Sequence, residues 1–233
     1  MPSSSAPSAP TMASSTASPA APAAPMTTPP PYRQIRALYD AETVTVYQAY
    51  SRTIAEAAVR EQRLDASPDF ICGQRMTWIK PSWCWMMYRS GYASKDLRQT
   101  HILALRLTHA TFKSLLLRAS LSSNHSVPSV PLTPEEKNMP VRVQWDPERS
   151  PRLERLGWRS LQVGISGTLV NEWVSGGIVS IEDVSERARR LGEWVENHKG
   201  EEGEWERLVE EGLVPRERVY EVDEEVRGRL GMD

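Results

Sequence analysis

Residues 1–31 carry no charged side chain and hold half of the 18 prolines of the chain, interspersed with alanine and serine. A segment of this kind cannot bury enough apolar surface to offset the entropy lost on ordering it. The sequence therefore predicts a disordered Pro/Ala/Ser tail, 1–31. Folding is confined to the remaining residues, roughly two hundred, which is the length of one domain.

Composition narrows the class of protein further. Hydrophobic residues make up 39% and charged residues 25% of the chain, as in ordinary soluble proteins. A net charge of −2 argues against a generally basic nucleic-acid binder. No apolar run reaches the roughly 18 residues of a membrane span, and the N-terminus lacks the basic and apolar parts of a signal peptide. We expect a cytoplasmic or nuclear protein without membrane contact.

Two cysteines and four scattered histidines do not have the spacing of a metal site. We expect no bound metal, and we interpret both cysteines as packing residues in a reducing compartment. A single disulfide between them is the alternative, since two is an even number.

Strand-like and helix-like patterns alternate irregularly after the tail. Strands are predicted at 32–39, 44–50, 75–80, 101–108, 141–146, 159–165 and 178–181. Helices are predicted after Ser51, at 82–89, at 111–119, at 167–173 and from 184, while 120–140 is predicted to be a loop. Pro147 is predicted to end its strand, and Ser185 to cap the last of these helices.

This order of elements does not repeat as in a doubly wound parallel sheet. It favours a single α+β domain with a mixed, largely antiparallel sheet flanked by short helices. We place the domain at 32–190. The segment 191–233, rich in Glu and Arg, is expected to be a charged, helical C-terminal extension that docks loosely.

The densest group of chemically useful residues is the block 78–91. Its tryptophans alternate with cations, a combination that can stack a planar ring and neutralise a phosphate. Lys80 and Arg89 flank the short predicted helix, and Ser82 lies at its N-terminus, where anions are favoured. Tyr88 is a further aromatic residue of this candidate binding group. In the alternative interpretation, the tryptophans are core and the cations are solvated.

Two further groups lie on predicted strands. Gln144, Asp146 and Glu148 lie beside a proline turn and could supply a polar or acidic catalytic group. Alternatively, Asp146 and Pro147 start a structural turn and Glu148 pairs with Arg149 in solvent. Gln48 on the strand 44–50, with Arg36 on the strand before it, could contact a nucleotide, or Gln48 could simply belong to a polar sheet face.

Five blocks in order resemble the family known as domain of unknown function 4291. They are Tyr32–Ala37, Thr45–Tyr50, Met76–Ser82, Trp85–Gly91 and Val143–Arg149, and the resemblance covers roughly 32–185. That family is more remotely similar to ADP-ribosyltransferase-like folds. The resemblance implies that Gln48 stands where those folds usually have His or Arg. It also implies that Ser82 or Tyr88 lies near the nicotinamide, and that Gln144 or Glu148 supplies the late-strand catalytic group.

Two functional hypotheses follow. In the first, the domain is an NAD-dependent ADP-ribosyltransferase acting on a protein or nucleic-acid acceptor. NAD is its substrate, Glu148 and Gln144 are catalytic, and the cofactor-binding residues are Gln48, Lys80, Ser82, Tyr88, Arg89 and Arg36. In the second, the domain is a non-catalytic module that binds a nucleotide or a single-stranded nucleic acid, with the tryptophans of the block as stacking platforms and no need for an acid. A structural protein whose tryptophan block is core is the third interpretation.

Overall fold

The computed structural model describes residues 30–73, 75–122, 133–134 and 138–232. The predicted tail therefore lies outside the described residues except for Pro30 and Pro31. Most of the predicted loop at 120–140 lies outside them as well.

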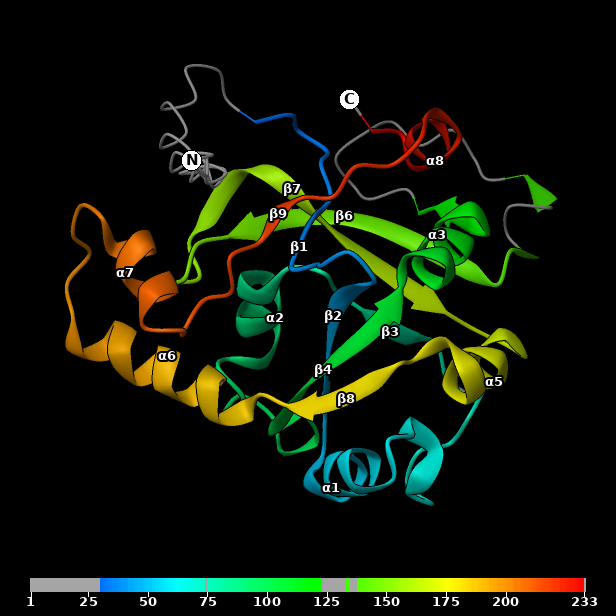
Figure 1. Ribbon diagram of the computed structural model, residues 1–233, viewed down its shortest axis with the longest axis horizontal. Coiled ribbons are helices and arrows are strands. Elements are labelled where there is room, and N and C mark those ends of the chain that lie inside the picture. The colour runs from blue at the N-terminus through cyan, green and yellow to red at the C-terminus, as the bar shows by residue number, and fades with distance from the viewer. Residues whose placement is uncertain (1–29, 74, 123–132, 135–137, 233) are drawn as a thin grey trace, which may run out of the picture.

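Two sheets form the framework of the domain (Figure 1). The three-stranded sheet is antiparallel and has the order β2 (Thr43–Tyr50), β4 (His101–Thr108), β8 (Ser180–Asp183). The four-stranded sheet has the order β3 (Thr77–Ile79), β7 (Arg155–Ile165), β6 (Val141–Arg149), β5 (Ala119–Leu121). Among the strand pairs of the described residues only β5–β6 is parallel, so the predicted α+β fold with a mixed, largely antiparallel sheet is confirmed.

Short helices surround these sheets. They are α1 (Arg52–Glu61), α2 (Trp83–Ser90), α3 (His109–Leu117), α5 (Leu169–Glu172), α6 (Ser185–Asn197), α7 (Glu204–Glu210) and α8 (Glu224–Leu230). Single turns occur at Leu64–Ala66, Leu97–Gln99 and Trp173–Gly177. In the described residues, no helix is both long and apolar enough to cross a membrane.

One backbone bridge joins the two sheets. The amide of Tyr47 on β2 donates to the carbonyl of Lys80 at 2.7 Å, and the amide of Lys80 donates back at 3.1 Å. Lys80 directly follows β3, so this bridge fixes the end of β3 against the middle of β2. It places the start of α2, including Ser82, at the seam between the two sheets.

The short helix α2 forms as its sequence predicts. The Oγ of Ser82 accepts a hydrogen bond from the amide of Trp85 and so caps the N-terminus. Gly91 ends the helix with φ of 56°, in the left-handed region that favours glycine. Six of the eight residues of α2 are buried, because both sheets and the C-terminal segment surround it.

Several predicted boundaries are wrong, and two of them have a clear physical cause. β6 continues through Pro147 to Arg149, because its partner β5 pairs only as far as Val143 and the missing N–H of proline lies on an open edge. Ser185 is the first residue of α6 rather than its cap. Its Oγ accepts a hydrogen bond from the amide of Ile102 on β4 and thereby ties α6 to the sheet.

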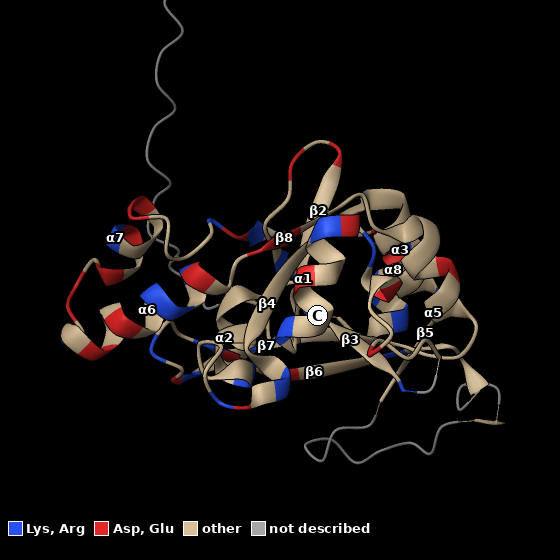
Figure 2. Cartoon of the chain, turned by 90° about the horizontal axis from the view of Figure 1, so that it is seen from below, with Lys and Arg blue, Asp and Glu red and all other residues tan. Residues whose placement is uncertain are grey.

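The C-terminal segment is helical as predicted, but it does not dock loosely. Leu208, Val226 and Leu230 are fully buried, and the carbonyl of Leu230 accepts a hydrogen bond from the indole of Trp145 at 2.8 Å. A short strand β9 (Arg218–Val219) also pairs with β1 (Arg36–Ala37). The segment carries charges of both signs along α6 and α7 (Figure 2), yet most of its apolar residues belong to the core or pack against it, and Trp205 is an exposed exception.

Candidate functional site

The predicted site residues line two separate pockets. The polar pocket has a volume of about 710 Å³, and its lining includes Gln48, Lys80, Trp85, Arg89, Gln144, Asp146 and Gln162. The second pocket has a volume of about 790 Å³, and its lining includes Arg36, Ser82, Cys84, Glu148 and Glu217. The structure thus brings Gln48, Lys80, Arg89 and Gln144 together, and it separates them from Arg36, Ser82 and Glu148.

A bulge in β6 causes this separation. Gln144 and Asp146 lie two residues apart on a regular strand and therefore point to the same side. Glu148 would point there too, but the pairing register shifts between Pro147 and Arg149, which turns its side chain to the other side. Regular alternation predicts one acidic and polar cluster, whereas the bulged strand supplies two pockets.

Lys80 is the most buried cation of the polar pocket. Its residue is 5% exposed, and its ammonium lies 4.8 Å from the ring centroid of Trp85. Among the described residues, none accepts a hydrogen bond from this ammonium or forms an ion pair with it. Burial lowers the pKa of Lys80 from 10.5 to about 7, with a further contribution from the positive charge of Arg89, and Asp146 opposes the shift. A buried cation without a close counter-ion is costly for the empty protein.

Gln48 is used by the protein itself. Its amide nitrogen donates to the Oγ1 of Thr77 at 2.7 Å and to the carbonyl of Trp78 at 3.0 Å. Its amide oxygen accepts from the hydroxyl of Tyr50 at 3.0 Å. Both amide protons are therefore engaged, and Gln48 forms a rigid wall that holds β3 against β2 rather than a free contact for a ribose.

The opposite wall is a small polar network from β6 and β7. The amide nitrogen of Gln162 donates to Gln144 at 2.7 Å and to the carboxylate of Asp146 at 2.5 Å. Partial burial raises the pKa of Asp146, and the positive charges of Lys80 and Arg159 act in the opposite direction. The network fixes the Gln144 and Asp146 side chains so that both face the space beside Lys80.

The rim of the polar pocket carries exposed cations. Arg75 and Arg89 both line it, and Arg89 has a long contact of 3.4 Å to the amide oxygen of Gln99. A ligand that enters would therefore pass two guanidinium groups before reaching Lys80. The pocket as a whole has one carboxylate, Asp146, against three cations.

The N-terminus of α2 is occupied by the protein's own carboxyl groups. Ser82 donates to Glu148 at 2.8 Å, and Glu217 accepts from the amide of Trp83 at 2.6 Å. Burial raises the pKa of Glu148, and it raises the pKa of Glu217 well above 4.5 with a contribution from the nearby Glu148 charge. Ser82 is 1% exposed and already bonded, so the anion predicted at this helix end is a side chain of the chain itself.

Tyr88 lies outside both pockets. It is 38% exposed, and the guanidinium of Arg149 stacks on its ring at 3.5 Å from the centroid. Among the tryptophans of the block, Trp83 is fully buried and Trp85 is 7% exposed. Trp78 is half-buried and lines the polar pocket. The core interpretation therefore holds for Trp83 and Trp85, but a pocket does lie beside them.

Sequence reasoning missed two residues of these pockets and left a third undecided. Asp146 could be either an acid of the group beside Pro147 or the start of a turn, and its spacing of two from Gln144 on a strand is a usable signal for the first. Gln162 lay on a correctly predicted strand, but only the register of β6 and β7 shows that it faces Gln144. Glu217 carried no signal, because it is one glutamate among many in the C-terminal segment.

Both cysteines, Cys72 and Cys84, are free thiols. Within the described part of the chain, no three His, Cys, Asp or Glu side chains gather as metal ligands would. The chemistry available in the polar pocket is therefore that of a buried amine, one carboxyl group and fixed amides.

Comparison with known proteins identifies the family of the chain. No curated protein matches the chain. The family model described as Domain of unknown function (DUF4291) matches residues 34–220, which is most of the chain and includes β2, β3, α2, β6 and β7 around the polar pocket. The chain therefore belongs to the DUF4291 family.

Proposed function

We propose that this domain binds a phosphate-bearing nucleotide in the polar pocket, with Lys80 as its central anchor. The observation that carries the proposal is the largely buried residue Lys80, which lines the pocket and for whose ammonium the described residues provide no counter-ion within ion-pair distance. An incoming phosphate supplies that counter-ion and offsets the cost of burying the charge.

The rest of the pocket fits a ligand of this class. A volume of about 710 Å³ lies within the roughly 300–1,000 Å³ typical of small-molecule sites. Arg75 and Arg89 at the rim can contact further phosphate oxygens, and the partly buried Trp78 offers an apolar wall for a base. Gln144 and Asp146, fixed by Gln162, can accept or donate hydrogen bonds to a ribose.

The test is calorimetric titration with ADP, ADP-ribose, NAD and short single-stranded RNA and DNA. Lys80→Met keeps the length of the side chain and removes its charge. It should weaken binding by about tenfold to a hundredfold, the usual effect of losing a charge-assisted hydrogen bond. Glu148→Gln is the matched control, because Glu148 lines the second pocket. Equal affinities of the wild type and Lys80→Met would refute the proposal.

The nucleic-acid version of this proposal has a narrower basis. Trp83 and Trp85 are buried and cannot stack with successive bases, so Trp78 is the one tryptophan of the block 78–91 that is available as a platform. We therefore favour a mononucleotide or dinucleotide over an extended strand. If a strand is the ligand, binding falls steeply with salt and also falls on Trp78→Ala.

ADP-ribosyl transfer from NAD is a second candidate function, favoured by the position of Asp146. The reaction breaks the bond between the ribose and nicotinamide and joins the ribose to an acceptor. A carboxylate beside the ribose stabilises the positive charge that develops there. Of the two acidic residues on β6, Asp146 lines the same pocket as Lys80 and Gln144, whereas Glu148 lines the second pocket. In this proposal Asp146 therefore takes the catalytic role that the sequence analysis gave to Glu148.

The corresponding assay is NAD consumption by the purified protein with RNA, DNA or protein acceptors. Asp146→Asn should abolish turnover while NAD still binds, and Glu148→Gln should leave turnover largely intact. The reverse pattern would return the catalytic role to Glu148. If the wild-type protein binds NAD but never consumes it, the domain is a binding module and the transferase proposal fails.

A further inference from the structure

A third, smaller pocket lies on the other side of β2 from the polar pocket. Gln48 and Tyr47 are adjacent on β2 and therefore point to opposite faces of the sheet. Gln48 faces the polar pocket, whereas Tyr47 faces a pocket of about 280 Å³. We call it the sheet-face pocket, and the lining residues used below are Asp40, Tyr47, Ala104, Arg106, Glu182 and Arg187.

The hollow arises from a small residue in the middle of a row. Tyr47, Ala104 and Glu182 are directly paired across β2, β4 and β8, so they stand side by side on one face. The methyl group of Ala104 leaves a gap between the two larger side chains. Arg187, on the first turn of α6, borders this gap from outside the sheet.

The hydroxyl of Tyr47 has an unmet hydrogen-bonding need. Tyr47 is 1% exposed, its ring packs edge-on against Trp83 at 5.2 Å, and its hydroxyl is buried without a hydrogen-bond partner among the described residues. Leaving such a group unsatisfied is costly, so native proteins usually supply a partner. Because Tyr47 lines the sheet-face pocket, a ligand bound there is a source for that partner.

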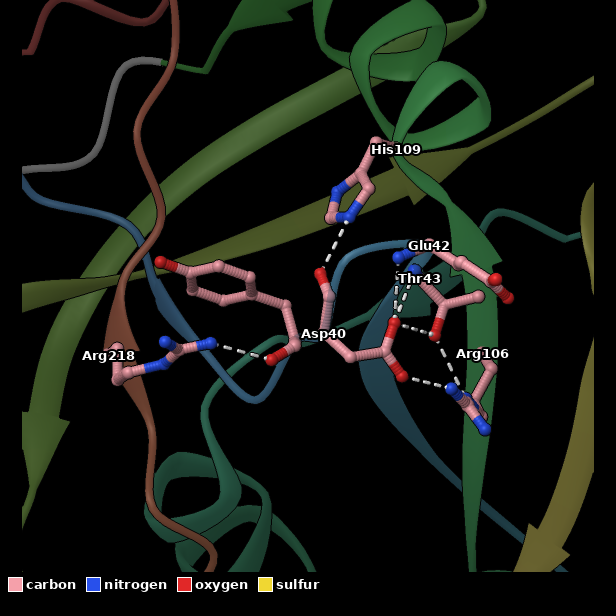
Figure 3. Close-up of polar contacts among 7 residues, drawn as sticks. Asp40, Glu42, Thr43, Arg106, His109 and Arg218 are labelled. Carbon is pink, nitrogen blue, oxygen red and sulfur yellow. Dashed lines mark hydrogen bonds and ion pairs between the residues drawn. The ribbon is translucent and has the colours of Figure 1, made fainter. Parts of the chain in front are cut away.

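Two of the four charges around the pocket are already paired with each other. Asp40 accepts hydrogen bonds from the amides of Glu42 and Thr43 and forms an ion pair with Arg106, as Figure 3 shows. These contacts keep the pKa of Asp40 low, at about 2. The two opposite charges at this corner of the pocket therefore offset each other.

The other two charged residues at the pocket, Arg187 and Glu182, are not paired with each other. Arg187 is half-buried, with its guanidinium 5.8 Å from the ring centroid of Trp83, and Glu182 is exposed at the pocket's edge. Neither residue belongs to an ion pair formed by the described residues. The pocket thus presents one unpaired cation, one unpaired anion and one unsatisfied hydroxyl around a hollow too small for a nucleotide.

We propose that the sheet-face pocket binds a small zwitterion of the amino-acid class. Its carboxylate contacts Arg187 and accepts a hydrogen bond from Tyr47, and its ammonium contacts Glu182. A simple anion of the same size would leave the Glu182 carboxylate facing it, whereas a zwitterion satisfies both charges. This site is independent of the nucleotide proposal, because its residues lie on the opposite face of β2.

The experiment is a calorimetric titration of the full-length protein with each standard L-amino acid. The best binder is then compared with its two analogues, one lacking the amine and one lacking the carboxylate. We expect at least one amino acid to bind, and both analogues to bind about tenfold more weakly or worse. No binding by any amino acid would overturn the proposal, as would an amine-free acid that binds as tightly as its parent.

Three variants localise the binding. Tyr47→Phe, which removes only the unsatisfied hydroxyl and should fold normally, and Arg187→Gln should each weaken binding by about tenfold. Glu182→Gln should weaken binding of the zwitterion but not binding of its amine-free analogue. Arg190→Gln is the control, because Arg190 is exposed on the same helix and does not line the pocket. Binding that survives both Tyr47→Phe and Arg187→Gln would place the ligand elsewhere and refute this site.

Discussion

Replacing the buried lysine of the polar pocket with methionine should stabilise the ligand-free protein. Lys80 is 5% exposed, and burial lowers its pKa from 10.5 to about 7. The unfolded chain therefore binds more protons than the folded chain between these two values, so the stability of the wild type rises with pH across this window. Below it the folded protein bears the full cost of a buried charge.

The size of the effect follows from the two pKa values. A shift of one unit corresponds to about 1.4 kcal/mol, so the cost at low pH is about 5 kcal/mol. The linkage relation between proton binding and folding gives the loss in unfolding free energy at each pH. This loss is about 4 kcal/mol at pH 7 and falls to about 1 kcal/mol at pH 10. Lys80→Met removes this cost. Its stability advantage over the wild type should therefore shrink by about 3 kcal/mol between pH 7 and pH 10.

Urea denaturation followed by tryptophan fluorescence measures this difference at each pH. The comparison between variant and wild type cancels the titration of the other groups, which both proteins share. Lys95→Met is the control, since Lys95 is exposed and its replacement should give no such trend. A difference between Lys80→Met and the wild type that does not change with pH would show that the ammonium of Lys80 is not desolvated as the structure indicates.

Four further predictions test other parts of the structure. Binding of ADP should draw a proton onto Lys80, so calorimetry at pH 8 in buffers of different ionisation enthalpy should show proton uptake by the wild type and none by Lys80→Met. Gly91→Ala should cost about 1–2 kcal/mol in a urea melt, because the residue has φ of 56°. Because the pKa of Glu217 is raised in the folded state, this residue lowers the stability of the wild type as pH rises above 4.5. The Glu217→Gln variant should therefore be as stable as the wild type below pH 4.5 and increasingly more stable than the wild type above it. Leu208→Ala should cost about 2–5 kcal/mol if the C-terminal segment is part of the core, whereas Val179→Ala, at a position 56% exposed, should change stability by less than about 0.5 kcal/mol.

Local signals predicted those elements whose formation depends on neighbours in sequence. The helix α2 is an example, because its start depends on the hydroxyl of Ser82 and its end on the backbone freedom of Gly91. The strand β4 was predicted with its observed bounds, His101–Thr108, since its apolar residues suit a strand between two others. The short strand β5 was missed, because three residues carry no periodic signal and only the parallel pairing with β6 reveals them.

The candidate site was predicted less well, because it depends on which face each side chain occupies. Sequence reasoning placed Lys80, Gln144 and Glu148 at one site. The register shift in β6 sends Glu148 to the second pocket, where it bonds to Ser82. Gln48 was correctly placed beside the block, but its amide proved to be bound by Thr77 and Trp78.

The sequence by itself determined the class of fold, the caps of α2 and the concentration of polar residues in the block that begins at Trp78. These follow from the conformational preferences of residues close together in the chain. The tertiary structure decided that Lys80 is buried near Asp146 but forms no ion pair with it. It also decided that the carboxyl groups of Glu148 and Glu217 occupy the N-terminus of α2. Those outcomes depend on a bulge, a register and a bridge between two sheets, each of which joins residues far apart in sequence.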